Sequence, residues 1–334
     1  MTDAPPLTPP ACPSNTALSS HTYTHDFITS GLDTSSWNIT SGNVTATSSG
    51  LAFTITQSGD APTIRSNWYI FFGRVSFLLR AAPGTGIVSS AILQSDDLDE
   101  IDWEWLGGAS YVNKAQSNYF GKGNTTSYDR AVWTDVSGTQ STTHNYTIVW
   151  TAAATTWYID GVAVRTLHFA DAVGGKNYPQ TPMDIRIGIW AGGDAANEQG
   201  TIEWAGGETD YSTGPFTMFL ESVEVVNENP GGNYKYGDRT GDWTSIEVNG
   251  AEEGGNGGSS SSSSESSSAV ESGAATGAPS ASTTQTTSSN SSPSPSTEYA
   301  QAVWGGASSV YLTIWQSGII CMIFLVHMIH EIMT

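Results

Sequence analysis

The segment Asp99-Glu100-Ile101-Asp102-Trp103-Glu104-Trp105 decides the fold class, because its acidic and apolar side chains alternate with a period of two. Side chains along a β-strand point to opposite faces in turn. Glu100, Asp102 and Glu104 therefore share one face, and the isoleucine and the tryptophans share the other. The pattern predicts a strand with one face in a hydrophobic core and three carboxyl groups on its other face.

The acidic face of this strand needs an explanation, because like charges on one face repel and a core strand has no structural need for them. A calcium loop is excluded, since Ile101 is apolar where such a loop needs an oxygen ligand, and the turn glycine is absent. Catalysis is the favoured interpretation. A different cation site and an exposed acidic edge are the alternatives.

The spacing of the two glutamates fits chemistry on glycosidic bonds. Four residue steps place the Cα atoms of Glu100 and Glu104 about 13 Å apart, and side chains that lean toward each other leave roughly 5–6 Å between the carboxyl groups. A retaining glycosidase needs about 5–5.5 Å and an inverting one about 6.5–9.5 Å. The spacing favours retention through a covalent glycosyl-enzyme, with Asp102 helping to keep opposite protonation states on the two glutamates.

The segments around this strand also predict β-structure. Runs rich in β-branched and aromatic residues occur at 69–79, 86–93 and 146–150, and Gly, Pro or Asn clusters bound them. Asp160-Gly161 separates two further runs of this kind, which is a strong hairpin signal. No amphipathic helix of about twelve or more residues is predicted, so the fold class is all-β.

The composition restricts the kinds of partner. The chain has 334 residues, with 32 acidic against 11 basic side chains and a formal charge of −21. Nucleic acid is excluded, because no basic patch of useful size can form. A neutral substrate with flat faces suits the 12 tryptophans. The only cysteines, Cys12 and Cys321, cannot build a disulfide scaffold or a Cys-rich zinc site.

Composition divides the chain into four parts. We expect a folded catalytic domain at 12–250, preceded by a short N-terminal remnant at 1–11. Residues 251–304 are rich in Ser and Thr and contain too little apolar surface to fold, so a disordered, O-glycosylated stalk or a plain linker is predicted. Small residues, a spacer and an apolar tail at 305–334 predict a GPI-attachment signal, with a transmembrane stub or a misread C-terminus as the alternatives.

A stalk and a lipid anchor require export. The first residues contain no apolar signal-peptide region, so we expect that the true N-terminus is missing from this sequence. Weak support for secretion comes from the Asn-x-Ser/Thr sequons, which predict N-glycosylation. They lie at Asn38, Asn43, Asn124, Asn145 and Asn290.

The sequence resembles glycoside hydrolase family 16, whose signature is similar to Asp-Glu-Ile-Asp-Trp-Glu-Trp-Leu-Gly at 99–107. Other segments resemble its fungal Crh-type branch, the cell-wall chitin–glucan transglycosylases, so the resemblance covers essentially all of 12–250. These segments are 84–90, 93–98, 116–120, 187–194 and 200–208. The resemblance implies a concanavalin-like jelly-roll sandwich of two antiparallel sheets with a concave substrate cleft.

The resemblance also assigns roles to residues. It implies that Glu100 is the nucleophile, Asp102 its helper and Glu104 the general acid/base. Positions that match the cleft-lining strand or the aromatic residues beside it are expected to bind substrate, although core packing also explains the tryptophans. They are Gln116, Asn118, Tyr119, Trp190 and Trp204. His144 matches a structural position rather than a catalytic one.

The implied activity is cleavage of β-1,4-linked GlcNAc chains and their transfer to β-glucan in a fungal cell wall. No cofactor or metal is required, and we expect a secreted monomer that contacts the membrane only through its lipid anchor. Relatives normally carry a nearby cysteine pair, so Cys12 has either lost its partner or is a free thiol. The alternatives are a hydrolytic endo-β-1,3(1,4)-glucanase and a lectin-like wall-binding protein without catalysis.

Overall fold

The computed structural model describes residues 13–250. The predicted remnant at 1–11, the stalk at 251–304, the tail at 305–334, both cysteines and Asn290 lie outside the described residues. Within 13–250, no helix has the length and apolarity that crossing a membrane requires.

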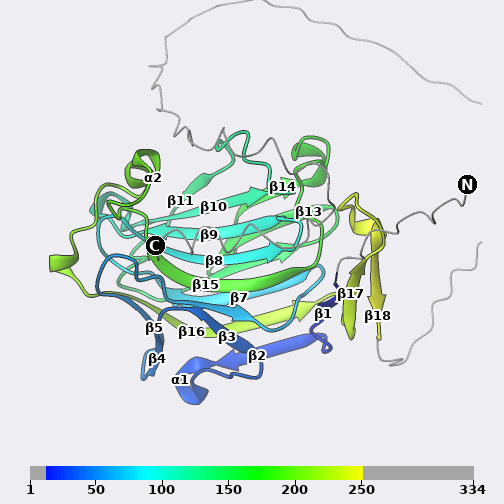
Figure 1. The fold of residues 1–334 in the computed structure, drawn as a ribbon, viewed down its shortest axis with the longest axis horizontal. Helices are drawn as coiled ribbons and strands as arrows, with labels where there is room; N and C mark the ends of the chain where they lie inside the picture. The colour runs from blue at the N-terminus through cyan, green and yellow to red at the C-terminus, as the bar shows by residue number, and fades with distance from the viewer. Residues whose placement is uncertain (1–12, 251–334) are drawn as a thin grey trace, which may run out of the picture. The chain divides into compact units, whose positions relative to one another are not determined.

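The strand with the three acids is the third of seven in one antiparallel sheet (Figure 1). The order across this sheet is β11 (Val132–Asp135), β10 (Lys114–Phe120), β9 (Glu100–Leu106), β8 (Ile87–Ser95), β15 (Met183–Ala191), β6 (Thr63–Ser66) and β3 (Trp37–Ser41). Strand β9 is therefore flanked on both sides by paired strands, and its backbone hydrogen bonds are satisfied within the sheet.

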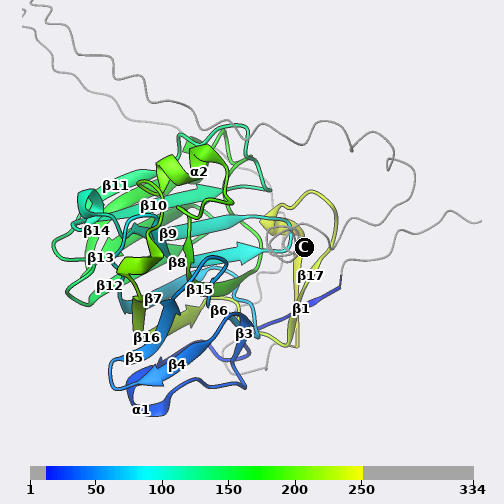
Figure 2. The ribbon, with the colours of Figure 1, turned by 60° about the vertical axis from the view of Figure 1, so that its left-hand side comes forward.

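A second antiparallel sheet of eight strands forms the other layer, and the two layers can be followed in Figure 2. Its order is β14 (Val162–His168), β13 (Ala154–Ile159), β12 (His144–Trp150), β7 (Gly73–Arg80), β16 (Phe216–Asn227), β5 (Gly50–Ile55) and β4 (Val44–Thr47), with β2 (Thr22–Asp26) also paired to β16. The predicted two-sheet, all-β jelly-roll sandwich is confirmed.

The remaining elements are short. A three-stranded sheet contains β1 (Asn15–Thr16), β17 (Asn233–Tyr236) and β18 (Ile246–Asn249). The α-helices of the described part are α1 (Phe27–Ser30) and α2 (Gln199–Trp204), and four 3-10 turns are η1 (Ala109–Tyr111), η2 (Phe169–Asp171), η3 (Tyr211–Thr213) and η4 (Trp243–Ser245). None approaches the length of an independently stable helix.

The core lies between the two large sheets and explains the apolar half of the alternation in β9. Ile101, Trp103 and Trp105 are fully buried there. The ring centroids of Trp103 and Trp105 lie 5.5 and 4.5 Å from that of Tyr146, which belongs to the opposite sheet. This contact between layers fixes which face of β9 points outward, because a slip of one residue would place carboxylates in the core.

The predicted hairpin at Asp160-Gly161 is confirmed, and it connects β13 to β14. Both turn residues have positive φ, 49° for Asp160 and 81° for Gly161. A two-residue turn with this geometry matches the twist of the flanking strands, and glycine adopts it without steric cost.

Candidate active site

The three carboxyl groups of β9 lie on the outer face of the seven-stranded sheet, opposite the core. The neighbouring strands place polar residues beside them, because directly paired residues in antiparallel strands share a face. Strand β8 places Gln94 opposite Glu100, and β10 places Gln116 opposite Glu104. The side chains of Glu100 and Glu104 are partly exposed, whereas Asp102 between them is only 2% exposed.

The opposite sheet supports β9 from below. The indole Nε1 of the fully buried Trp157 donates a hydrogen bond of 3.0 Å to the backbone carbonyl of Asp102. This bond connects β13 to the midpoint of the acidic strand. With the two buried tryptophans of β9, it holds the backbone under the carboxyl groups in one position.

Glu100 has several polar partners. Gln94 Nε2 donates a hydrogen bond to Glu100 Oε2, and Asp102 also forms a side-chain hydrogen bond with Glu100. Burial raises the pKa of Glu100, while the hydrogen bonds from Asp102 and Gln94 and the nearby charge of Arg186 lower it. Every one of these partners favours the ionised carboxylate.

The surroundings of Asp102 favour its protonated form. Burial raises its pKa well above the ordinary value, and the neighbouring charges of Glu100 and Glu104 raise it further. A protonated Asp102 donates its hydrogen to Glu100 and so supports the negative charge there. Asp102 Oδ1 is buried and has no hydrogen-bond partner within 13–250.

The surroundings of Glu104 differ from those of Glu100. Its carboxyl group forms no hydrogen bond with any side chain or backbone group of the described chain. Burial raises the pKa of Glu104 to about 8, with a further contribution from the charge of Glu100. Glu104 therefore holds a proton at neutral pH and has no internal acceptor for it, which suits a group that donates to a substrate.

The predicted substrate-binding residues of β10 divide between the two faces of the sheet. Gln116 and Asn118 pair with Glu104 and Asp102 and lie on the acidic face. Tyr119 pairs with the buried Ile101, is 7% exposed and belongs to the core. The prediction for Tyr119 is therefore wrong: its position in the strand's alternation turns it inward, where the guanidinium of Arg165 lies 5.4 Å from its ring centroid.

The two predicted aromatic residues come together at the Glu104 end of the acidic face. The rings of Trp190, on β15, and Trp204, in α2, are stacked with centroids 6.1 Å apart. Both are partly exposed and pack against a small cluster that includes Val88 and Leu106. Trp190 pairs with Val88, and Val88 pairs with Leu106, so this cluster shares the outer face with the carboxyl groups.

His144 lies in the other sheet and has structural partners. Its Nδ1 lies 2.6 Å from Asp160 Oδ2 and its Nε2 lies 2.9 Å from the carbonyl oxygen of Ser137. These contacts agree with the structural role expected for it.

The sequon asparagines differ in their surroundings. Asn38 and Asn43 are exposed, whereas Asn124 and Asn145 are partly buried. Asn124 Nδ2 donates to Asn177 Oδ1 at 2.9 Å, and Asn145 Oδ1 accepts from Thr147 at 2.8 Å. N-glycosylation stays a prediction at all four.

Two residues beside Glu100 were missed by the sequence analysis. Arg186 donates to Gln94 and Gln94 donates to Glu100, although Gln94 and Arg186 are 92 positions apart. Gln94 lies in a segment that carried the family resemblance, but nothing in the chain's alternation indicates that Arg186 reaches it.

Asp99, directly before Glu100, is fully buried and bonds to two loops, and the sequence analysis also missed it. It accepts hydrogen bonds from the backbone nitrogens of Lys122, Gln180 and Thr181 at 2.9, 2.8 and 3.1 Å. Burial, with the charge of Asp97, raises its pKa to about 7. These bonds join the start of β9 to two loops. One loop follows β10 and contains Lys122, and the other precedes β15 and contains Gln180 and Thr181.

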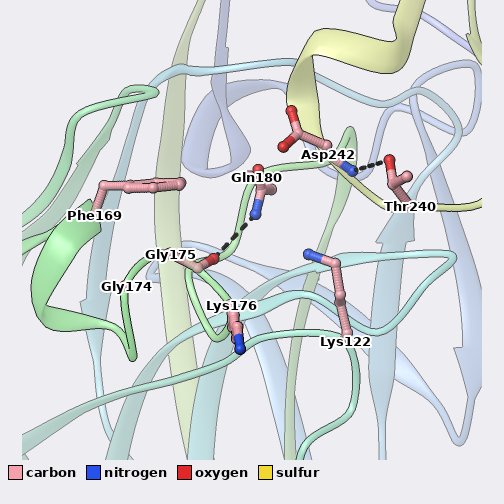
Figure 3. Close-up of a pocket in the computed structure, with 8 residues that line it drawn as sticks. All are labelled: Lys122, Phe169, Gly174, Gly175, Lys176, Gln180, Thr240 and Asp242. Atoms are coloured by element: carbon pink, nitrogen blue, oxygen red, sulfur yellow. Dashed lines mark hydrogen bonds between the residues drawn. The ribbon is translucent and has the colours of Figure 1, made fainter.

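A cavity of about 330 Å³ lies next to these loops (Figure 3). Its wall includes Lys122 and Gln180, with the ring of Phe169 on the opposite side from Lys122. None of the predicted site residues lines it. Within 13–250, no group of three or more His, Cys, Asp or Glu side chains is arranged to hold a metal ion.

Comparison with known proteins identifies the family of this chain. Residues 32–206 match the model of the glycosyl hydrolases family 16. The chain belongs to this family. The chain is 56% identical over 244 residues to Crh-like protein 1 of Aspergillus fumigatus, covering 73% of this chain and 67% of that protein.

Solved structures agree with the family. The structure titled Crh5 transglycosylase in complex with NAG is similar with a TM-score of 0.69 and 52% identity, covering 71% of this chain and 97% of that one. A Bacillus licheniformis β-glucanase is similar with a TM-score of 0.53 and 22% identity, covering 63% of this chain and 99% of that one. The second likeness concerns the fold alone.

Proposed function

We propose that the family 16 domain is a retaining transglycosylase in which Glu100 is the nucleophile and Glu104 the general acid/base. The observation that carries the proposal is the difference in surroundings between two glutamates on one strand face. Glu100 is surrounded by groups that stabilise negative charge, and Glu104 is a protonated acid without an internal partner. Two carboxyl groups with separated protonation states are what acetal cleavage with retention requires.

In the first step, the carboxylate of Glu100 attacks the anomeric carbon and forms a glycosyl ester. The glycosidic C–O bond breaks, and its oxygen leaves with the proton of Glu104. In the second step, Glu104 removes a proton from the hydroxyl group of an acceptor sugar. That oxygen attacks the anomeric carbon, and Glu100 departs as a carboxylate, so the enzyme returns to its starting state.

The proposed donor is a β-1,4-linked GlcNAc chain, and the proposed acceptor is β-glucan. The donor is supported by the 52% identical transglycosylase whose structure was solved with NAG. The stacked Trp190 and Trp204, at the Glu104 end of the acidic face, offer apolar surface for the C–H face of a sugar. Gln116 and Asn118 provide hydrogen-bonding groups beside the carboxyl groups. We further propose that the protein acts in the fungal cell wall, held by a GPI anchor.

A mixed-product assay tests this function. The purified full-length chain is incubated with chitin oligomers and a labelled laminarin oligomer, and products are separated and weighed by mass spectrometry. A labelled product heavier by whole GlcNAc residues is expected. It should be absent without donor and with Glu100→Gln.

Other outcomes of the assay identify the alternatives. New reducing ends without a mixed product indicate a hydrolytic glucanase. Oligosaccharide binding without any turnover indicates a wall-binding protein and contradicts the assignment of Glu100 and Glu104.

A further inference from the structure

A row of hydrogen-bonded side chains extends from Glu100 across two neighbouring strands of the acidic face. Gln94 of β8 donates to Glu100, and Arg186 of β15 donates through Nη1 to Gln94 Oε1. Arg186 also holds Asp184, with Nε at 2.7 Å from Oδ1 and Nη2 at 3.1 Å from Oδ2. Sheet pairing produces this row, because Asp184 pairs with Gln94 and Gln94 pairs with Glu100.

The row is fixed at its far end. The side chain of Asp184 is fully buried, and Arg65 of β6 donates to it from Nε at 2.8 Å, so it binds a second guanidinium. The side chain of Arg186 is itself only 15% exposed. A two-point contact with a carboxylate restrains the plane and direction of a guanidinium. Arg186 therefore presents Nη1 to Gln94 from a fixed position.

The direction of the Gln94 amide follows from these contacts. A guanidinium only donates hydrogen bonds, so it must face the carbonyl oxygen of the amide. The NH₂ group of Gln94 then points at Glu100, where it can donate but cannot accept. An ionised Glu100 satisfies this donor, whereas a proton on the contacted oxygen would oppose it.

We propose that Gln94 and Arg186 are positioning residues that orient Glu100 for attack and keep it ionised. The inference rests on the proposed role of Glu100 as nucleophile. It adds that the ionisation of this group depends on a contact made two strands away.

The other charged groups near Glu100 do not replace this contact. On its own strand, Asp102 supports the negative charge of Glu100 through a hydrogen bond but supplies no positive charge, and Glu104 is acidic. Strand β10 faces Glu100 with Phe120, which does not titrate. Arg165 of β14 lowers the pKa of Asp102 rather than that of Glu100. Arg186 is the basic side chain whose charge lowers the pKa of Glu100.

The test compares variants of the full-length chain. Gln94→Glu keeps the shape and the acceptor for Arg186 but replaces the donor to Glu100 with a second carboxyl oxygen. Gln94→Met keeps a similar length without polar atoms. Arg186→Lys keeps the charge but loses the two-point contact. Arg74→Gln removes an exposed positive charge from β7 of the other sheet and serves as the matched control.

Two measurements are made on each variant. The first is the acid limb of the pH dependence of kcat/KM, which reports the ionisation of the free enzyme's nucleophile. The second is an NMR titration of the Glu100 carboxyl carbon, which needs no turnover. Unfolding temperatures identify variants that fail to fold, and Arg186→Lys then replaces the Gln94 variants as the test.

We expect Gln94→Glu to move the acid limb and the Glu100 titration upward by about one pH unit or more. Gln94→Met and Arg186→Lys should move both in the same direction by a smaller amount, and Arg74→Gln should move neither. A folded Gln94→Glu variant whose Glu100 titrates as in the wild type would overturn the inference. Failure of the proposed function would give a different result, because the wild-type chain itself would then show no transfer.

Discussion

Two ends of one strand differ more than their sequence suggests. Glu100 and Glu104 are the same residue type on the same face of β9. At the Glu100 end, β8 and β15 contribute Gln94, Asp184 and Arg186. At the Glu104 end, the same strands contribute Ser90 and Gly188, followed by Val88 and Trp190. On the side of β8 and β15, Glu100 therefore meets a hydrogen-bond donor and positive charge, whereas Glu104 meets small and apolar groups.

This difference shows how a sandwich assigns different chemistry to identical side chains. Burial raises the pKa of both glutamates, so it cannot separate them. The difference between the two glutamates comes from the neighbouring strands. They provide a hydrogen bond and a nearby guanidinium charge to Glu100, and neither to Glu104.

The largest effect is expected from removing the nucleophile. Glu100→Gln keeps the size of the side chain but cannot form a glycosyl ester, so kcat should fall by at least about 10⁴-fold. Binding of chitin oligomers should remain within a few-fold of the wild type. Turnover and calorimetric binding measure the two quantities. Activity close to that of the wild type would remove Glu100 from the mechanism.

Removing the acid at the other end should be less severe and should depend on the leaving group. Glu104→Gln is expected to lower kcat by about 10²–10⁴-fold on oligosaccharides. With an activated aryl glycoside, whose leaving group needs no proton, formation of the glycosyl-enzyme should be much less affected. Burst kinetics with both donors check this. An equal loss with both would mean that Glu104 is not the acid.

The pH dependence of kcat/KM should report the ionisation of both Glu100 and Glu104. Activity needs Glu104 protonated, so kcat/KM should fall as the pH rises through about 8, by about tenfold per pH unit beyond it. It needs Glu100 ionised, so kcat/KM should also fall on the acid side, and the raised pKa of Glu100 shifts this limb upward from the ordinary value of a glutamate. A profile of kcat/KM from pH 4 to 10 measures both limbs. If Glu104→Gln left the alkaline limb in place, that limb would belong to another group.

The smallest effect is expected at the aromatic cluster. Trp190→Ala removes one of two stacked rings at the Glu104 end and should raise KM by about three- to tenfold with little change in kcat. Initial rates over a range of donor concentrations separate the two constants. A matched substitution at the core, Trp103→Phe, should instead lower the unfolding temperature. A Trp190 variant that loses stability without a change in KM would indicate packing alone.

The sequence analysis predicted the local features well. The strand at the acidic segment and the turn at Asp160-Gly161 follow from short-range alternation and turn chemistry, whereas the two-sheet architecture was implied by the family resemblance. The error at Tyr119 came from treating every residue of β10 as cleft-lining. The alternation that predicted the acidic face places Tyr119 on the other face of the strand from Gln116 and Asn118. Gln94 and Arg186 could not be joined in advance, because their contact depends on how β8 and β15 pair.

The amino-acid sequence alone determined which residues of β9 turn away from the core, since a pleated backbone imposes that pattern on its own. The tertiary structure decided which of the two glutamates receives a hydrogen bond from a neighbouring strand and lies near a guanidinium charge. That choice depends on side chains brought by strands 92 residues apart, whose register is set by burial of the core face rather than by any local signal.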